Sequence, residues 1–140
     1  MKDFFRQLKE NYLSIFSLFI AVVALIHNNL LYEKSERNRN IRTASFEILM
    51  KLGELQQTVN TAYFDPTSKF SLIKGWGYIA LIGDLSKLIP SPVPQKAEKL
   101  IGEWKSHYAN IDNNDESLDV ISNEIDATRE AILNVITNLH

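Results

Sequence analysis

Residues 11–32 read NYLSIFSLFIAVVALIHNNLLY and carry no charged side chain. An α-helix rises about 1.5 Å per residue, so a helix of this length can cross roughly 30 Å of hydrocarbon. Tyr12 and Tyr32 stand at the two ends, where aromatic rings with a polar tip favour the membrane–water interface. We therefore expect a single transmembrane helix over 11–32.

The strictly apolar part of this segment is short. Leu13 to Ile26 would span only about 21 Å, so a membrane helix must also include His27, Asn28 and Asn29. Polar side chains at that depth are costly unless they pair across helices or contact water, which makes the three residues a candidate gate or pore lining. The alternative is that they lie at the headgroup level, at the end of a short span.

Small and polar residues recur at heptad spacing along the same segment. They are Ser14, Ser17, Ala21, Ala24 and Asn28. In lipid, such a seam permits close helix approach and hydrogen bonds between helices. We expect the chain to form a homo-oligomer through this seam; the alternative is chance, because Ala and Ser are common in membrane anchors.

Basic residues flank the uncharged segment on both sides. Lys2, Arg6 and Lys9 precede it, and Lys34, Arg37, Arg39 and Arg42 follow it. The excess on the C-terminal side predicts a single-pass protein of the inner membrane with its C-terminal domain in the cytoplasm. A signal peptide also begins with basic residues, but no small-residue cleavage site follows this stretch.

The basic segment at residues 33–40, with Arg42 just beyond it, has a second interpretation. Basic side chains beside a membrane attract anionic lipid at about 1 kcal/mol each. In an oligomer, Arg37, Arg39 and Arg42 would form stacked rings of guanidinium groups suited to an anionic small molecule such as a nucleotide. The alternative is that these basic residues only set the orientation of the membrane helix and bind no ligand.

Composition limits the remainder of the chain, residues 41–140, to one small helical domain. The protein has 140 residues and no cysteine, which excludes disulfides and thiolate zinc sites. Beyond Asn40 there are nine Lys and Arg against thirteen Asp and Glu, a net charge of −4. Duplex nucleic acid requires a clustered basic surface, so it is a poor candidate partner.

Apolar residues at three- and four-residue spacing predict four helices in this domain. The first covers about 36–63, and the absence of Gly and Pro between Leu13 and Gly53 predicts that the membrane helix continues into it. Asp65 and Pro66 should end it. Its expected core positions are Ile41, Ala44, Ile48, Leu52, Leu55 and Val59.

The other three helices follow after short connections. The second is expected over 78–88, and three prolines at 90, 92 and 94 predict an extended connection to a third, which runs from Val93 to Tyr108. A turn and cap signal at 112–115 precedes a fourth helix over about 118–139. The predicted fold is all-α, a transmembrane helix continuing into an antiparallel four-helix bundle.

The segment Lys74-Gly75-Trp76-Gly77-Tyr78 is the remaining candidate ligand site. A flexible basic and aromatic loop can stack a base or sugar and approach phosphate with its amides. Lys74, Trp76 and Tyr78 would then bind the ligand. The alternative is that Trp76 and Tyr78 are core residues of a helix whose start is loosened by glycine.

The sequence gives no support for an enzyme. It contains no Gly-x-Ser-x-Gly elbow, no phosphate-binding glycine loop and no His-Glu-x-x-His motif. His27, His107 and His140 are too scattered to predict a metal site, and we expect neither a cofactor nor a metal. Carboxylates that could be imagined as catalytic pairs lie on the polar face of the last helix, and a solvated helix face explains them better. They are Glu124 and Asp126, or Asp115, Glu116 and Asp119.

Residues 38–65, NRNIRTASFEILMKLGELQQTVNTAYFD, together with GWGY and PVPQ, resemble small uncharacterised bacterial inner-membrane proteins. Those proteins have one N-terminal span and a helical cytoplasmic domain, and the resemblance implies no activity. In architecture alone the chain is also similar to membrane effectors of bacterial phage defence, in which a cytoplasmic domain senses a cyclic nucleotide and perturbs the membrane.

Two functional hypotheses follow. The first is a non-enzymatic, membrane-anchored helical interaction or regulatory protein, with membrane lipid and further copies of itself as partners. The second is a ligand-gated membrane effector, in which an anionic signal at the basic residues or near Lys74 acts on the His27 region. A small enzyme ranks third.

Overall fold

The computed structural model describes residues 2–65 and 70–139, with side chains described from residue 11 onward except at residues 70 and 71. Most of these residues are helical, with no strand among them: α1 (Lys2–Phe64), α2 (Phe70–Ser86), α3 (Val93–His107), a short 3-10 helix η1 (Tyr108–Asn110) and α4 (Asp115–Thr137). The chain divides into two compact units, Met1–Arg37 and Asn38–His140. The all-helical prediction is confirmed.

The first unit consists of the N-terminal part of α1. This helix begins at Lys2, so the expected N-terminal flank, residues 1–10, is helical from that residue, although its side chains lie outside the described residues. From Asn11, α1 contains an 18-residue window with a mean hydropathy of 1.9, none of which is buried. By length and composition this helix can span a membrane.

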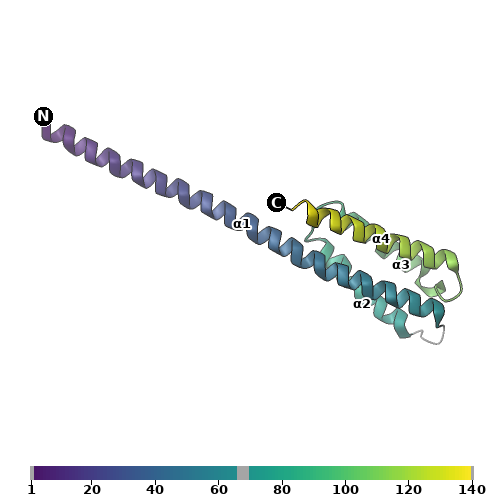
Figure 1. The fold of residues 1–140 in the computed structure, drawn as a ribbon. Helices are drawn as coiled ribbons and strands as arrows, with labels where there is room; N and C mark the ends of the chain where they lie inside the picture. The colour runs from purple at the N-terminus through teal and green to yellow at the C-terminus, as the bar shows by residue number, and fades with distance from the viewer. Residues whose placement is uncertain (1, 66–69, 140) are drawn as a thin grey trace. The chain divides into compact units, whose positions relative to one another are not determined.

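The second unit, the helical domain, packs the 38–64 part of α1 and helices α2, α3 and α4 around one core (Figure 1). Every core position predicted for α1 is buried, since a stripe at three- and four-residue spacing faces one side of a helix. From α3 and α4 the fully buried side chains include Leu100, Trp104, Ile121, Ile125 and Ile132.

The start of α4 follows the expected capping chemistry. Asn114 is the N-cap, and its side-chain oxygen accepts a hydrogen bond from the Ser117 backbone amide at 3.2 Å. Asp115 and Glu116 occupy the first turn, where negative charge favours the helix dipole. At the other end the C-cap is Asn138, and Arg42 of α1 donates to the carbonyl of the next residue, Leu139, at 3.4 Å. The predicted cap signal at 112–115 is confirmed.

The start of α2 differs from the prediction. A helix was expected from Tyr78, after two glycines that loosen the chain, but α2 is helical from Phe70 and includes both glycines. Gly75 is buried against Trp104: a Cβ at Gly75 would lie 2.4 Å from Trp104 Cζ2. A Cβ at Gly77 would meet nothing within 4 Å. The predicted loop is therefore wrong, and Gly75 permits close packing of a ring on the helix backbone.

The proline segment forms turns instead of an extended connection. Ile89 donates its backbone amide to Ser86, and Val93 donates to Pro90, which closes two successive turns. Pro92 is the N-cap of α3, and Pro94 lies in its first turn, where a missing amide donor costs nothing. The predicted end of the first helix agrees with α1 ending at Phe64, and Pro66 lies outside the described residues.

Candidate functional site

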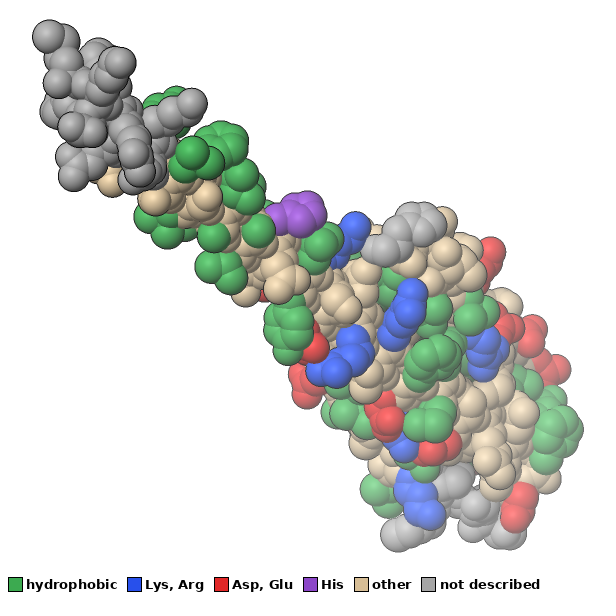
Figure 2. Space-filling view, turned by 60° about the vertical axis from the view of Figure 1, so that its left-hand side comes forward, with side chains coloured by type: hydrophobic (Ala, Val, Ile, Leu, Met, Phe, Trp, Pro, Cys, Tyr) green, Lys and Arg blue, Asp and Glu red, His purple; other side chains and the backbone are tan. Residues whose placement is uncertain are grey.

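The N-terminal part of α1 exposes a long series of large apolar side chains. They include Leu13, Ile15, Phe16, Leu18, Phe19, Ile20, Val22, Val23, Leu25, Ile26, Leu30 and Leu31. Phe19 is 64% exposed and Leu25 is 69% exposed. Figure 2 shows hydrophobic side chains on the near face of this segment, and the Lys and Arg side chains in that view lie over the part of the chain that follows it.

The predicted seam residues lie on this exposed helix. Ser14, Ser17, Ala21, Ala24 and Asn28 are all exposed, and helical periodicity places them along one side of α1. No large side chain of α1 stands between Ala21 and Ala24 on that side, so a second helix can approach the backbone there.

The three candidate gate residues do not point in one direction. His27, Asn28 and Asn29 are consecutive on an α-helix, so their side chains project about 100° apart. All three are exposed. Asn28 and Asn29 line a shallow surface groove with Leu25, Ile26 and Tyr32, whereas His27 is not part of it. A polar lining built from this helix would therefore use the two asparagines.

The predicted basic site is divided between the two units. Arg37 ends the first unit, whereas Arg39 and Arg42 belong to the second. All three side chains are exposed. Arg42 donates to the backbone carbonyl of Leu139, two residues after the end of α4, so its side chain also has a contact within the helical domain.

Lys74, Trp76 and Tyr78 lie on α2 but do not converge on one ligand position. Trp76 packs edge-on against Trp104, with ring centroids 6.3 Å apart. Lys74 and Tyr78 instead line a separate groove with Glu54 and neighbouring α1 residues. Lys51 approaches the Tyr78 ring at 5.6 Å from its centroid, and a hydrogen bond to Glu54 is the main reason that the Lys51 pKa is raised.

Trp76 lines a cavity of about 310 Å³, which we call the aromatic cavity. Its walls come from the end of α1, the first turns of α2 and the segment after α3. The lining residues are Ala62, Leu72, Ile73, Trp76, Tyr108, Ala109 and Asp112. The rings of Trp76 and Tyr108 meet at 76°, with centroids 5.1 Å apart, and Trp104 stacks on Tyr108 from within the core.

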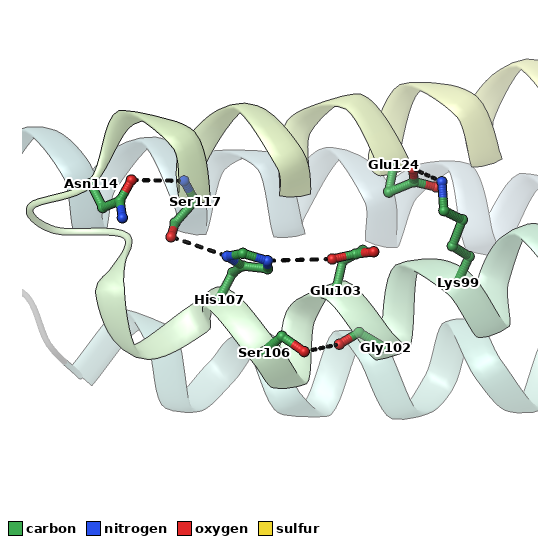
Figure 3. Close-up of polar contacts among 8 residues, drawn as sticks. All are labelled: Lys99, Gly102, Glu103, Ser106, His107, Asn114, Ser117 and Glu124. Atoms are coloured by element: carbon green, nitrogen blue, oxygen red, sulfur yellow. Dashed lines mark hydrogen bonds and ion pairs between the residues drawn. The ribbon is translucent and has the colours of Figure 1, made fainter.

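A polar cluster that the sequence interpretation missed joins α3 to α4 (Figure 3). His107 Nδ1 lies 3.2 Å from Ser117 Oγ, and His107 Nε2 lies 3.4 Å from Glu103 Oε2. The order Ser–His–Glu has the composition of a nucleophilic triad. Ser117 is only 2% exposed, however, and it lies in the capped first turn of α4, so this cluster fastens two helix ends.

A second polar link joins the same two helices further along. Lys99 of α3 forms an ion pair with Glu124 of α4, and this hydrogen bond is the main reason that the Lys99 pKa is raised (Figure 3). The Glu124 side chain is 13% exposed, so it does not belong to the solvated face expected for the α4 carboxylates. Its position on the inner flank of α4 follows from the i+3 spacing after Ile121.

The described residues contain no group of three or more His, Asp or Glu side chains that is arranged to hold a metal ion. Comparison with protein-family models, with curated proteins and with solved structures gives no match.

Proposed function

We propose that this protein is a non-enzymatic, membrane-anchored helical interaction protein that self-associates through α1. The observation that carries the proposal is the series of exposed large apolar side chains between Tyr12 and Tyr32, uninterrupted by charge. An exposed apolar surface of this length is unfavourable in water and is stabilised in hydrocarbon. The chain then crosses the inner membrane once at 11–32.

The helical domain, in this proposal, is an antiparallel four-helix bundle in the cytoplasm. Three contacts between α1 and α4 support opposite helix directions: Arg42 with Leu139, Gln56 with Ser122, and Tyr63 with Asp115. The cytoplasmic side is supported by the excess of basic residues that follow the span, Lys34, Arg37, Arg39 and Arg42.

Self-association is proposed to use the seam of small residues. The test replaces Ala21 and Ala24 together by Leu, which adds bulk where two backbones would approach. We expect the detergent-solubilised double variant to have a smaller mass by light scattering coupled to size exclusion. The matched control is Val23→Phe, which adds bulk on the opposite side of the helix and should leave the mass unchanged. An unchanged mass for the double variant would remove the seam from the proposal.

The second candidate function is a ligand-gated membrane effector. It is favoured by the groove that Asn28 and Asn29 line near the end of the apolar segment, because polar groups at such a depth need water or a partner helix. The exposed basic residues Arg37, Arg39 and Arg42 are its proposed contacts for an anionic signal such as a cyclic nucleotide.

The effector function predicts membrane depolarisation when the protein is induced together with its signal. Asn28→Leu should weaken that effect, whereas the control Leu30→Val should preserve it. Normal membrane polarisation with every cyclic nucleotide supplied would contradict the effector function and favour the interaction protein.

A further inference from the structure

One side of α1 within the helical domain is exposed and carries large apolar side chains. Phe46 is 57% exposed and Met50 is 56% exposed. Thr43 precedes them, Gly53 and Gln57 follow them, and all three are exposed as well. Helical periodicity places these five residues along one side of α1, which we call the outer face.

The other sides of α1 are occupied within the domain. Ile48 is fully buried in the core. Gln56 donates a hydrogen bond to Ser122 of α4 at 3.0 Å, and Lys51 approaches the Tyr78 ring of α2. The outer face is therefore the side of α1 that is left for a partner.

The spacing of the outer face is that of a helix-pairing seam. In the heptad notation a–g, Thr43, Met50 and Gln57 occupy position a, and Phe46 and Gly53 occupy position d. A Cβ at Gly53 would meet nothing within 4 Å, so a second helix can approach the backbone at this point. A second copy of α1 presents the same spacing, as a symmetric pair requires.

The charges beside the outer face favour a second copy in parallel orientation. Arg42 lies at position g and Glu47 at position e, and in parallel helices g of one helix lies beside e of the partner's next heptad. Arg42 is exposed, and the Glu47 side chain is 40% exposed, with Lys51 at 3.9 Å. Glu54 also lies at position e, so an antiparallel pair, which brings e beside e, would place carboxylates together.

We propose that the outer face binds the same face of a second copy in parallel, with Arg42 of each copy beside Glu47 of the other. This contact joins the helical domains of the oligomer. The inference rests on the proposed self-association, because chains held side by side in the membrane cross it in the same direction and meet at high effective concentration.

The test is disulfide cross-linking of the full chain in isolated membranes. The protein has no cysteine, and two introduced cysteines join only where their Cα atoms come within about 7 Å. We expect Met50→Cys to form a dimer on oxidation about tenfold faster than the control Gln95→Cys, an exposed position on α3. Equal rates, or a Met50→Cys product whose mass is not that of two chains, would overturn the proposal.

A charge exchange tests the orientation in the Met50→Cys background. Arg42→Glu alone and Glu47→Arg alone each place like charges together and should lower the cross-linked fraction about threefold. The double variant restores opposite charges and should recover that fraction, although it still lacks the Arg42 hydrogen bond to Leu139. A double variant no better than the single ones would overturn the parallel pairing.

Light scattering of the detergent-solubilised Met50→Cys chain in its reduced form separates this inference from the proposed function. An oligomeric mass without cross-linking would overturn the contact through the outer face and leave self-association in the membrane standing. A monomeric mass without cross-linking would overturn both.

Discussion

The close contact between Gly75 and Trp104 predicts a large stability difference between two neighbouring glycine substitutions. A Cβ at Gly75 would lie 2.4 and 2.5 Å from two carbons of the Trp104 ring, whereas carbon atoms in contact lie about 3.5–4.0 Å apart. The ring or α2 would have to move by roughly 1 Å. Trp104 is fully buried and held by Trp76 and Tyr108, so the ring has little space to move.

The magnitude follows from comparing Gly75→Ala with Gly77→Ala. Both positions are inside α2, so both variants gain about 1 kcal/mol of helix propensity. Only Gly75→Ala also overpacks the core, which costs about 1–3 kcal/mol, and the depth of this overlap favours the upper end. The gain cancels in the comparison, so Gly75→Ala should be less stable than Gly77→Ala by about 3 kcal/mol.

The assay is urea unfolding of the full chain in detergent, followed by tryptophan fluorescence. Both tryptophans belong to the helical domain, so the signal reports that unit. Gly77→Ala is expected at or above the wild-type midpoint, and Gly75→Ala well below it. Equal midpoints for the two variants would refute the reasoning, because the difference between the positions would then not come from the Trp104 contact.

Three further predictions concern α4, the alkaline limit of stability and the link between α3 and α4. Asn114→Ala removes the N-cap and should cost about 1 kcal/mol in urea unfolding, whereas Asn113→Ala, one residue earlier and exposed, should change the free energy of unfolding by less than about 0.5 kcal/mol. The Tyr63 pKa is raised mainly by its hydrogen bond to Asp115, and the Lys99 pKa is raised mainly by Glu124, so the folded state holds both protons more tightly than the unfolded state. The stabilisation of the folded state by these two groups is complete at neutral pH and is lost as pH rises above about 10. Tyr63→Phe combined with Lys99→Met should therefore make the alkaline loss of stability less steep. An equally steep loss in the double variant would show that these two groups do not cause it. Lys99→Met leaves the largely buried Glu124 carboxylate without the Lys99 ammonium and should lower the thermal stability. Adding Glu124→Gln removes the buried charge and should restore part of that stability. A further loss of stability would show that Glu124 has another partner.

The helices were predictable because the information that specifies them is local. Apolar residues three and four apart share one side of a helix, and all six core positions expected for α1 are buried. The Asn114 cap was likewise visible in four consecutive residues. Local patterns did not predict the ligand site, as the 74–78 segment illustrates. In the helix α2, Trp76 lines the aromatic cavity, whereas Lys74 and Tyr78 line a separate groove.

The missed features depend on contacts between residues distant in sequence. In the sequence, Gly75 suggested a flexible chain. The position of Trp104 on the facing helix α3 shows instead that Gly75 lets the Trp104 ring pack closely on the backbone of α2. His107 and Ser117 are ten residues apart and meet because a turn brings the end of α3 to the start of α4. The i, i+4 spacing of Glu103 and His107 was the one local signal for that cluster.

We propose that residues 11–32 cross the membrane and leave the helical domain in the cytoplasm, and cysteine labelling tests this topology directly. The protein has no cysteine, so single cysteines can be labelled without background. We would introduce Lys9→Cys, Val22→Cys and Ser91→Cys in separate variants and treat intact cells with a membrane-impermeant maleimide. We expect labelling of Lys9→Cys in intact cells, of Val22→Cys only after denaturation, and of Ser91→Cys only after permeabilisation. Labelling of Ser91→Cys in intact cells, or of Val22→Cys in native membranes, would contradict it.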